Sequence, residues 1–250
     1  MSGWLAIAGL GPGNAALVTP EVSLALAQAT DIVGYFPYVA RVEPRPGLVL
    51  HGSDNRVEMD RATHALRMAQ DGRRVVVVSS GDPGVFAMAS AVFEAVETGQ
   101  MEWRSLDIRV LPGVSAMLAA AARVGAPLGH DFCVINLSDN LKPWALIETR
   151  LRLAVQAGFA MAFYNPRSAA RPEQFARALD VLREDSQEDR LVIFARAVTT
   201  AEEQIQVVRL SEARADMADM RTMVIVGSPT TRLIQRPDAA PIVYTPRSAG

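Results

Sequence analysis

The chain has 250 residues, of which 50% are hydrophobic and 21% are charged, as expected for a globular enzyme of one large or two small domains. Its formal net charge of −2 excludes an overall electrostatic attraction to nucleic acid or to an anionic membrane. The single cysteine excludes an internal disulfide and a multi-cysteine metal site, and the scattered histidines do not indicate a histidine metal site.

The first residues carry no basic segment ahead of their short apolar run, and no run in the chain reaches the length of a membrane span. We therefore expect a cytoplasmic protein without a signal peptide, and with no metal, membrane or nucleic-acid partner. Cys133 lies within the apolar run 132–135, so we expect a buried and inert thiol.

The first half of the chain alternates strand patterns with helical patterns, which is typical of a parallel α/β sheet. Thr19 and Pro20 indicate a helix start, because threonine caps helices and proline favours the first helical position. The four valines 75–78 indicate a strand that is buried on both faces. Strands are expected over 4–10, 31–35, 48–51, 75–78 and 106–111. Helices are expected over 20–29, 56–70, 85–96 and 116–124.

A glycine- and proline-rich segment, 125–129, predicts a domain boundary. We expect an N-terminal α/β domain of residues 1–126, a C-terminal α/β domain of residues 127–236, and a poorly ordered, proline-rich tail of residues 237–250. Strands are expected over 132–136, 159–164, 191–195, 204–209 and, as the last one, 222–226. Helices are expected over 144–157, 172–183 and 211–217. No helix separates 191–195 from 204–209, so the second sheet is expected to be mixed.

A tight turn follows the valine strand, in the segment SSGDPGVF (79–86). In open α/β sheets, ligands bind where strands reach their carboxyl ends. Gly81 and Gly84 let the backbone approach a ligand closely, and Asp82 offers a carboxylate to a cation or a hydroxyl group. The alternative is an ordinary turn in which Asp82 caps the following helix.

Other motifs stand at strand ends along the chain: GLGPG (9–13), LPGVSA (111–116), FYNPRS (163–168), ARAVT (195–199) and TMVIVG (222–227). GLGPG lacks the spacing of a dinucleotide fingerprint, and Pro12 interrupts it. Taken singly, each motif also has a structural interpretation, such as a tight turn, a helix cap at Ser115 or a solvated loop at Arg167.

The order of these motifs along one chain resembles the tetrapyrrole methyltransferases, the class III S-adenosylmethionine methyltransferases. The resemblance extends from residue 3 to about residue 234. It implies two α/β domains with a cleft between them, in which S-adenosylmethionine binds in a folded conformation, and it implies a homodimer. A sulfonium methyl group is already an activated electrophile, so no protein nucleophile is required, and the chain lacks any Ser-His-Asp or Cys-His signature.

The resemblance also implies site residues, position by position. Cofactor contacts are expected at Gly81, Asp82, Pro83, Val85, Phe86, Ser115, Ala116, Tyr164, Asn165, Ala195, Thr222 and Met223. Asn165 stands where many relatives have methionine, and Ala195 where relatives often have glycine. Contacts to the substrate are expected at Pro12, Tyr35, Arg167 and Arg171. Further candidate partners for substrate carboxylates are Arg41, Arg45 and Lys142, and a general acid or base remains open among Asp82, Tyr35, Glu58 and His130.

Within the family, the segments 33–35, 79–82 and 163–168 are most similar to the branch that methylates precorrin-3B at C-17, with ring contraction, in cobalamin biosynthesis. The alternative within the fold is another precorrin or cobalt-precorrin methyltransferase, and the sequence leaves open whether the substrate holds cobalt. A ribosomal RNA methylase would require a basic stripe, which is missing. A nicotinamide oxidoreductase would require the full glycine fingerprint. A non-catalytic tetrapyrrole carrier remains a further alternative.

Overall fold

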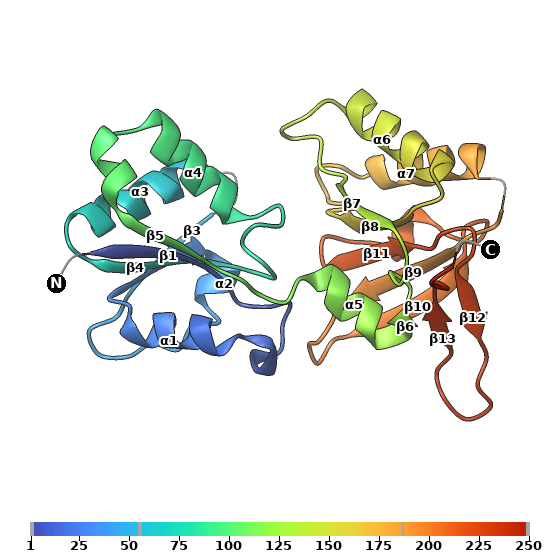
Figure 1. Cartoon of the computed structure of the whole chain (residues 1–250), viewed down its shortest axis with the longest axis horizontal. Coiled ribbons are helices and arrows are strands. Elements are labelled where there is room, and N and C mark those ends of the chain that lie inside the picture. Colours follow the sequence, from blue (N-terminus) through green and yellow to red (C-terminus); the bar gives the residue numbers. More distant parts are fainter. Residues whose placement is uncertain (1–2, 55–56, 187, 249–250) are drawn as a thin grey trace. The chain divides into compact units, whose positions relative to one another are not determined.

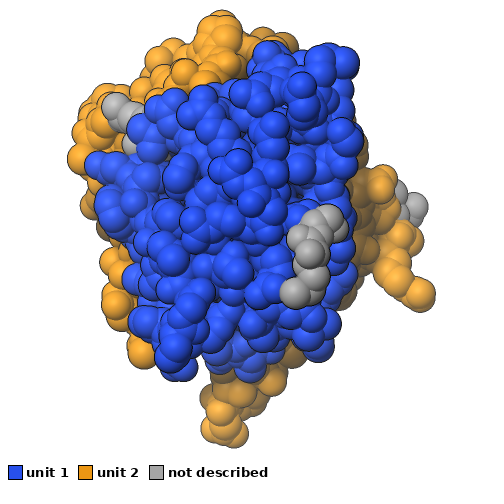
Figure 2. Space-filling model, turned by 90° about the vertical axis from the view of Figure 1, so that its left-hand side faces the viewer, with its two compact units in different colours: residues 1–115 blue, residues 116–250 orange. Residues whose placement is uncertain are grey.

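The computed structural model describes residues 3–54, 57–186 and 188–248 (Figure 1). The chain divides into two compact units, residues 1–115 and 116–250, which are coloured separately in Figure 2. The sequence predicted a boundary after residue 126. In the structure the boundary follows residue 115, so helix α5 (Ala116–Val124) and strand β6 (Gly125–Ala126) belong to the second unit. Both pack within that unit, because α5 contacts strand β11 (Thr222–Val226) and β6 pairs with strand β13 (Ile242–Tyr244).

Unit 1 is built on a five-stranded sheet with the strand order β3-β2-β4-β1-β5. All of its pairings are parallel, which confirms the parallel sheet expected from the sequence. Its strands are β1 (Trp4–Gly9), β2 (Asp31–Tyr35), β3 (Val49–Ser53), β4 (Arg74–Ser79) and β5 (Asp107–Leu111). Parallel strands end at one edge, so the loops after β1, β4 and β5 share that edge.

Helices cover both faces of this sheet (Figure 1). On one face, α3 (Glu58–Gln70) and α4 (Met88–Thr98) pack on a core that includes Val75 and Val77. On the other, α1 (Pro20–Gln28) and α2 (Phe36–Val39) belong to the side whose core includes Val76 and Val78. The four valines therefore face alternate sides and all are fully buried, as predicted.

Two helix starts can be compared with the sequence. The Thr19 hydroxyl accepts a hydrogen bond from the Val22 amide at 3.3 Å, so the expected cap of α1 is confirmed. Helix α4 begins at Met88 and not at residue 85, because Phe86 has a left-handed backbone with φ of 52°. The predicted start of α3 at Arg56 lies outside the described residues, and the helix is described from Glu58.

Unit 2 has a mixed sheet, as the sequence predicted, with the strand order β10-β9-β11-β8-β7. Strands β7 and β8 are parallel, and the pairs β8–β11, β11–β9 and β9–β10 are antiparallel. The remaining strands are β7 (Phe132–Asn136), β8 (Ala160–Tyr164), β9 (Leu191–Arg196) and β10 (Gln204–Arg209). Helices α6 (Trp144–Gln156) and α7 (Gln174–Asp185) share one core with the sheet around Phe163 and Phe175. Cys133 is half-buried in β7, and burial raises the pKa of its thiol.

The end of the chain differs from the sequence expectations. A helix over 211–217 does not form, and only a short 3₁₀ turn, Ala215–Met217, is present there. Strand β11 is not the last, because β12 (Arg232–Ile234) and β13 form a small sheet with β6. Val243 is fully buried, so part of the expected tail is packed against the rest of unit 2. The apolar run around Val243 is short and flanked by prolines, so the sequence did not indicate a strand there. No helix in the described part of the chain is both long and apolar enough to cross a bilayer.

Candidate cofactor and substrate sites

Three strand-end loops of unit 1 meet backbone to backbone. The Gly81 amide donates to the Gly11 carbonyl at 2.9 Å, and the Gly11 amide donates to the Gly81 carbonyl at 3.2 Å. A Cβ atom added to Gly9 or to Gly113 would lie 2.4 Å or 2.2 Å, respectively, from the Gly81 carbonyl oxygen. The loops after β1, β4 and β5 can therefore touch only because these positions are glycine.

Asp82 ties two of these loops together. One carboxylate oxygen accepts from the Gly84 amide at 2.8 Å, and the other accepts from the Gly113 amide at 3.0 Å. The N-cap of α4 is Ala87, so the alternative in which Asp82 caps that helix is wrong. Both carboxylate oxygens are engaged by backbone N–H groups, which indicates a fixed acceptor that shapes the loops and argues against a general acid or base.

Ser115 carries a buried hydroxyl group at the end of the loop after β5. Its side chain is 4% exposed, and its Oγ atom has no hydrogen-bond partner among the described residues. Ser115 thus does not cap α5. A buried polar atom without a partner costs about 1–3 kcal/mol, so its presence favours a ligand that completes the bond.

Non-glycine residues with a left-handed backbone gather in the predicted site loops. Phe86 and Asn165 have φ of 52°, Ala197 has φ of 49° and Thr199 has φ of 69°. Phe86 follows the GDPG turn, Asn165 follows β8, and Ala197 and Thr199 follow β9. This conformation costs about 1–2 kcal/mol for an ordinary residue, and such strain is concentrated at functional sites. Asparagine adopts it more readily, which gives the departure at position 165 a physical reason.

The carboxyl ends of β7 and β8 present two asparagines side by side. The Asn165 side-chain amide donates to the Asn136 Oδ1 atom at 3.1 Å, and that oxygen also accepts from the Ser138 amide at 2.9 Å. Asn136 and Tyr164 are register partners, so the residue after Tyr164 reaches the same edge. Sequence reasoning missed Asn136, although an amide side chain at the carboxyl end of a parallel strand is itself a signal.

Arg171, expected to contact the substrate, is buried, with 7% of its surface exposed. One guanidinium nitrogen donates to the Asn165 carbonyl at 3.3 Å and to the Leu137 carbonyl at 3.4 Å. Arg41 similarly donates to the carbonyls of Leu10 and Gly11 in the N-terminal loop. Both arginines therefore bond to backbone carbonyls of their own unit, and Arg171 also donates to the Met220 sulfur at 3.8 Å. Burial lowers the pKa of Arg41.

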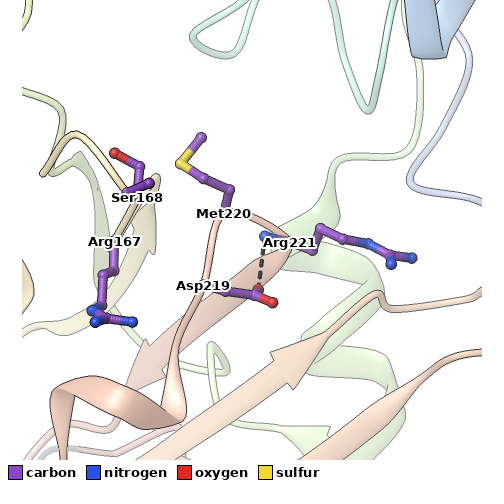
Figure 3. Close-up of a pocket in the computed structure, with 6 residues that line it drawn as sticks. Arg167, Ser168, Asp219, Met220 and Arg221 are labelled. Atoms are coloured by element: carbon purple, nitrogen blue, oxygen red, sulfur yellow. Dashed lines mark hydrogen bonds between the residues drawn. The ribbon is translucent and has the colours of Figure 1, made fainter. Parts of the chain in front are cut away.

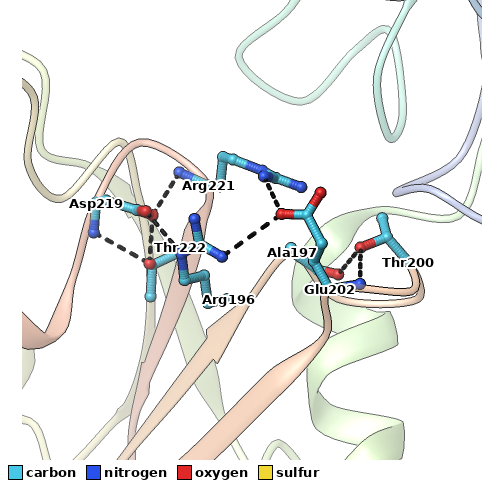
Figure 4. A network of polar contacts seen from close by, with 7 residues as sticks. All are labelled: Arg196, Ala197, Thr200, Glu202, Asp219, Arg221 and Thr222. Carbon is cyan, nitrogen blue, oxygen red and sulfur yellow. Dashed lines mark hydrogen bonds and ion pairs between the residues drawn. The ribbon is translucent and has the colours of Figure 1, made fainter.

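The last predicted cofactor residues lie on neighbouring strands of unit 2. Met223 of β11 pairs in register with Ala195 of β9, and both are buried. The Thr222 hydroxyl donates to the Asp219 carboxylate at 2.8 Å (Figure 4). Burial opposes the ionisation of Asp219, but hydrogen bonds from Thr222 and Arg196 outweigh it and hold the pKa of Asp219 below its ordinary value.

A cavity of about 290 Å³ lies beside this network in unit 2 (Figure 3). It is lined by Arg167, Ser168, Ala169, Asp219, Met220 and Arg221. The side chains of Arg167 and Arg221 point in different directions in Figure 3, and Arg221 pairs with Glu202 at 2.7 Å (Figure 4). Arg167 donates only to the Pro172 carbonyl, at 3.3 Å, among its contacts with described residues, so its charge is available to a ligand.

A second cavity, of about 340 Å³, lies in unit 1 between strand β3 and helix α3, and sequence reasoning did not anticipate it. It is lined by Val33, His51, Gly52, Ser53, Val57, Asp60, Arg61 and His64. Behind it, the fully buried Asp31 carboxylate lies 2.8 Å from the His51 Nε2 atom and 2.6 Å from the Arg73 guanidinium. No group of three or more His, Cys, Asp or Glu residues able to hold a metal occurs within the described ranges.

The Asp31 cluster predicts an acid-dependent stability. Burial opposes the ionisation of Asp31, but hydrogen bonds from His51, Thr30 and Arg73 outweigh it, so the folded-state pKa of Asp31 lies below 3.8. The stabilisation is present above the unfolded pKa and is lost as the pH falls through the folded pKa. Asp31→Asn is expected to lower the free energy of unfolding at pH 7 by about 3 kcal/mol and to flatten its fall below pH 4. Urea titrations from pH 7 to pH 2 measure this; parallel curves for the two proteins would contradict it.

The remaining acid–base candidates lie in different places. Tyr35 ends β2 and packs edge-to-face on Tyr38, with ring centroids 5.4 Å apart. Glu58 begins α3. His130 precedes β7, so it lies at the amino edge of that strand, opposite Asn136, with its nearest acid, Asp131, at 3.9 Å. Pro12 is half-buried in the loop after β1, next to the Gly11–Gly81 contact.

The chain is similar to known methyltransferases and cobalamin biosynthesis proteins. The model of the tetrapyrrole (corrin/porphyrin) methylase family matches residues 5–214. A precorrin-3B C(17)-methyltransferase from Sinorhizobium sp is 53% identical over 247 residues, which cover 99% of this chain and 97% of that protein. The cobalamin biosynthesis protein CobIJ of Mycobacterium tuberculosis (strain ATCC 25618 / H37Rv) is 44% identical, and the chain spans about half of its length, 48%.

Solved structures of methyltransferases have a similar fold. The crystal structure of the methyltransferase CobJ has a TM-score of 0.94 and 65% sequence identity, and the match covers 98% of this chain and 100% of that one. A uroporphyrin-III C-methyltransferase from Thermus thermophilus, complexed with S-adenyl homocysteine, has a TM-score of 0.67 and 20% identity, covering 90% of this chain and 97% of that one. The second match shows the fold alone.

Proposed function

The chain belongs to the tetrapyrrole (corrin/porphyrin) methylases, and we propose that it transfers the methyl group of S-adenosylmethionine to C-17 of precorrin-3B, with ring contraction, in cobalamin biosynthesis. The Sinorhizobium relative, similar over nearly its whole length, supports this substrate. The cofactor assignment is supported by the junction of the loops after β1, β4 and β5. The last of these loops ends at the buried Ser115 hydroxyl, which has no hydrogen-bond partner in the described part of the chain.

We assign the cofactor contacts to the same residues that the family motifs indicated, in loops of both units. In unit 1 these are the backbone of Gly81, the residues Pro83, Val85 and Phe86, and the hydroxyl of Ser115. Asp82 acts here by shaping the loops, because both of its carboxylate oxygens are taken by backbone amides. In unit 2 they are Ala116, Tyr164, Asn165, Ala195, Thr222 and Met223.

The bound sulfonium cofactor supplies an activated methyl group, so the chain needs no nucleophile of its own. The work of the protein is to hold donor and acceptor carbon within about 3–3.5 Å in a fixed orientation. Rigid loops suit this task. The glycine contacts and the Asp82 bridge fix one set of loops, and the Asn136–Asn165 hydrogen bond fixes another.

The substrate carries several acetate and propionate carboxylates, which require cations. Arg167 lines the unit 2 cavity and is our first candidate, since arginine recognises carboxylates well. We place Pro12 and Tyr35 along the substrate in unit 1. We also propose a cytoplasmic homodimer; a light-scattering mass equal to one 27.0 kDa chain would exclude the dimer.

Methyl transfer is tested by incubating the protein with S-adenosylmethionine carrying a labelled methyl group and with precorrin-3B. A product with one added methyl group supports the proposed function. Turnover only with a different precorrin or a cobalt-precorrin would move the assignment to another member of the family. Tetrapyrrole binding without any turnover would favour a carrier.

Ser115→Ala is expected to have opposite effects on stability and on binding. Removal of a buried, unpartnered hydroxyl should raise the free energy of unfolding by about 1 kcal/mol, whereas the affinity for S-adenosylhomocysteine should fall about tenfold. Calorimetric titration and urea unfolding measure the two quantities. Ser105→Ala, at an exposed serine of the same unit, should leave the affinity unchanged. Unchanged affinity in Ser115→Ala would remove Ser115 from the site.

A further inference from the structure

Two cations reach the same turn at the carboxyl end of β7. The Lys142 ammonium donates to the Ser138 carbonyl at 3.1 Å, and the Arg171 guanidinium donates to the adjacent Leu137 carbonyl. Arg171 also donates to the carbonyl of Asn165, which follows β8. Positive charge is thus concentrated where two neighbouring parallel strands end, which is the edge at which α/β sheets bind ligands.

Neither Lys142 nor Arg171 forms an ion pair within the part of the chain that the structure describes. The neighbouring Asp139 carboxylate accepts a hydrogen bond from Gln174 at 3.1 Å. Burial is the main cause that lowers the pKa of Lys142; the charges of Arg150 and Arg171 add to it, and Asp139 offsets it only in part. An anion that binds here would stabilise the charged ammonium group.

The two cations differ in their accessibility. Arg171 is buried and bonded to backbone carbonyls of two loops, so it serves as a fixed charge. Lys142 is only partly buried, and its hydrogen bond to the Ser138 carbonyl can be exchanged for one to a ligand. A lysine ammonium on a flexible stem is suited to this exchange.

We propose that Lys142 binds a carboxylate side chain of the tetrapyrrole substrate at the carboxyl edge of β7 and β8, with Arg171 as the fixed neighbouring charge. The identity of the ligand rests on the proposed function. Arg171 is a positioning residue here, since it is buried and donates to the Asn165 carbonyl.

Uroporphyrin, a stable porphyrin with acetate and propionate side chains, is the probe. Its dissociation constant is measured by fluorescence titration for the parent chain and for Lys142→Met, Lys142→Arg and Arg150→Met. Arg150 is the matched control, because it is an exposed cation of the same neighbourhood. Lys142→Met should weaken binding about tenfold, the loss expected for one charge-assisted hydrogen bond, and Lys142→Arg should restore most of it. Arg150→Met should change binding by less than about twofold.

The outcomes separate this inference from the proposed function. Equal weakening by Lys142→Met and Arg150→Met, unchanged binding in Lys142→Met, or no binding of uroporphyrin by the parent chain overturns the role of Lys142. Methyl transfer by the parent chain is measured separately with precorrin-3B. If the parent binds through Lys142 but does not methylate, the proposed function fails alone. If it methylates, and Lys142→Met changes neither the porphyrin affinity nor the KM for precorrin, the inference fails alone.

Discussion

Gly113→Ala is expected to abolish measurable binding of S-adenosylhomocysteine. The new Cβ atom would lie 2.2 Å from the Gly81 carbonyl oxygen and 2.8 Å from the Gly9 carbonyl oxygen. Both are backbone atoms, so no side-chain rotation relieves the clash, and the three loops must separate. Overpacking of this kind costs about 1–3 kcal/mol of stability, and a shift of about 1 Å in a site can cost about a hundredfold in function.

Gly84→Ala is the matched control for this substitution. Gly84 lies in the same loop as Gly81, but an added Cβ would meet only the Asp82 side-chain oxygen, at 3.2 Å. Its affinity for S-adenosylhomocysteine should stay within about threefold of the parent value, because a few tenths of an ångström of movement are enough. Calorimetric titration measures the affinity of both variants for S-adenosylhomocysteine, and circular dichroism checks that both are folded. If Gly113→Ala binds as tightly as Gly84→Ala, the loop junction does not form the cofactor site.

Asp82→Asn is expected to weaken cofactor binding by about 10- to 100-fold. Each Asp82 carboxylate oxygen accepts one backbone N–H, from Gly84 or from Gly113. An asparagine has only one oxygen, so its NH₂ group must oppose the other backbone donor. The loss of a charge-assisted hydrogen bond and the new donor–donor contact together cost about 1.5–3 kcal/mol.

Asp107→Asn is the control for Asp82→Asn. Asp107→Asn removes an exposed carboxylate of unit 1 that pairs with Arg109, so its effect on binding should be small. If Asp82 shapes the site, Asp82→Asn should lower the affinity for S-adenosylhomocysteine and turnover together. Normal affinity with lost turnover would instead make Asp82 an acid or base and would contradict the positioning role.

Much of the fold was readable from local patterns. The buried strand 75–78 and the parallel and mixed sheets were predicted, because a buried face requires apolar residues at a regular spacing in the sequence. The helix start at Thr19 and Pro20 was predicted from the residue types that favour such positions. The strand-end motifs identified the loops in the same way. Short elements were not readable: β12 and β13 are each three residues long and depend on β6 or on each other for their pairing.

The roles of individual charged residues were the least predictable. Arg171 was expected to contact the substrate, and it is buried against the carbonyls of Leu137 and Asn165. Asn136 was not considered, yet it holds Asn165 in place. A side chain's type states which bonds it can form, whereas the partner that it finds depends on residues distant in the chain.

The amino-acid sequence by itself indicated the family, through the resemblance of its motifs. It also predicted the two α/β sheets and the loops at their carboxyl ends, because periodic burial and turn-forming residues are local properties. Only the tertiary structure decided that Gly9, Gly81 and Gly113 are in contact, that Asp82 joins two loops and that the Ser115 hydroxyl is buried without a hydrogen-bond partner among the residues described. Each of these depends on segments of the chain that are brought together by packing of the strands in one sheet, and no local pattern specifies the distance between them.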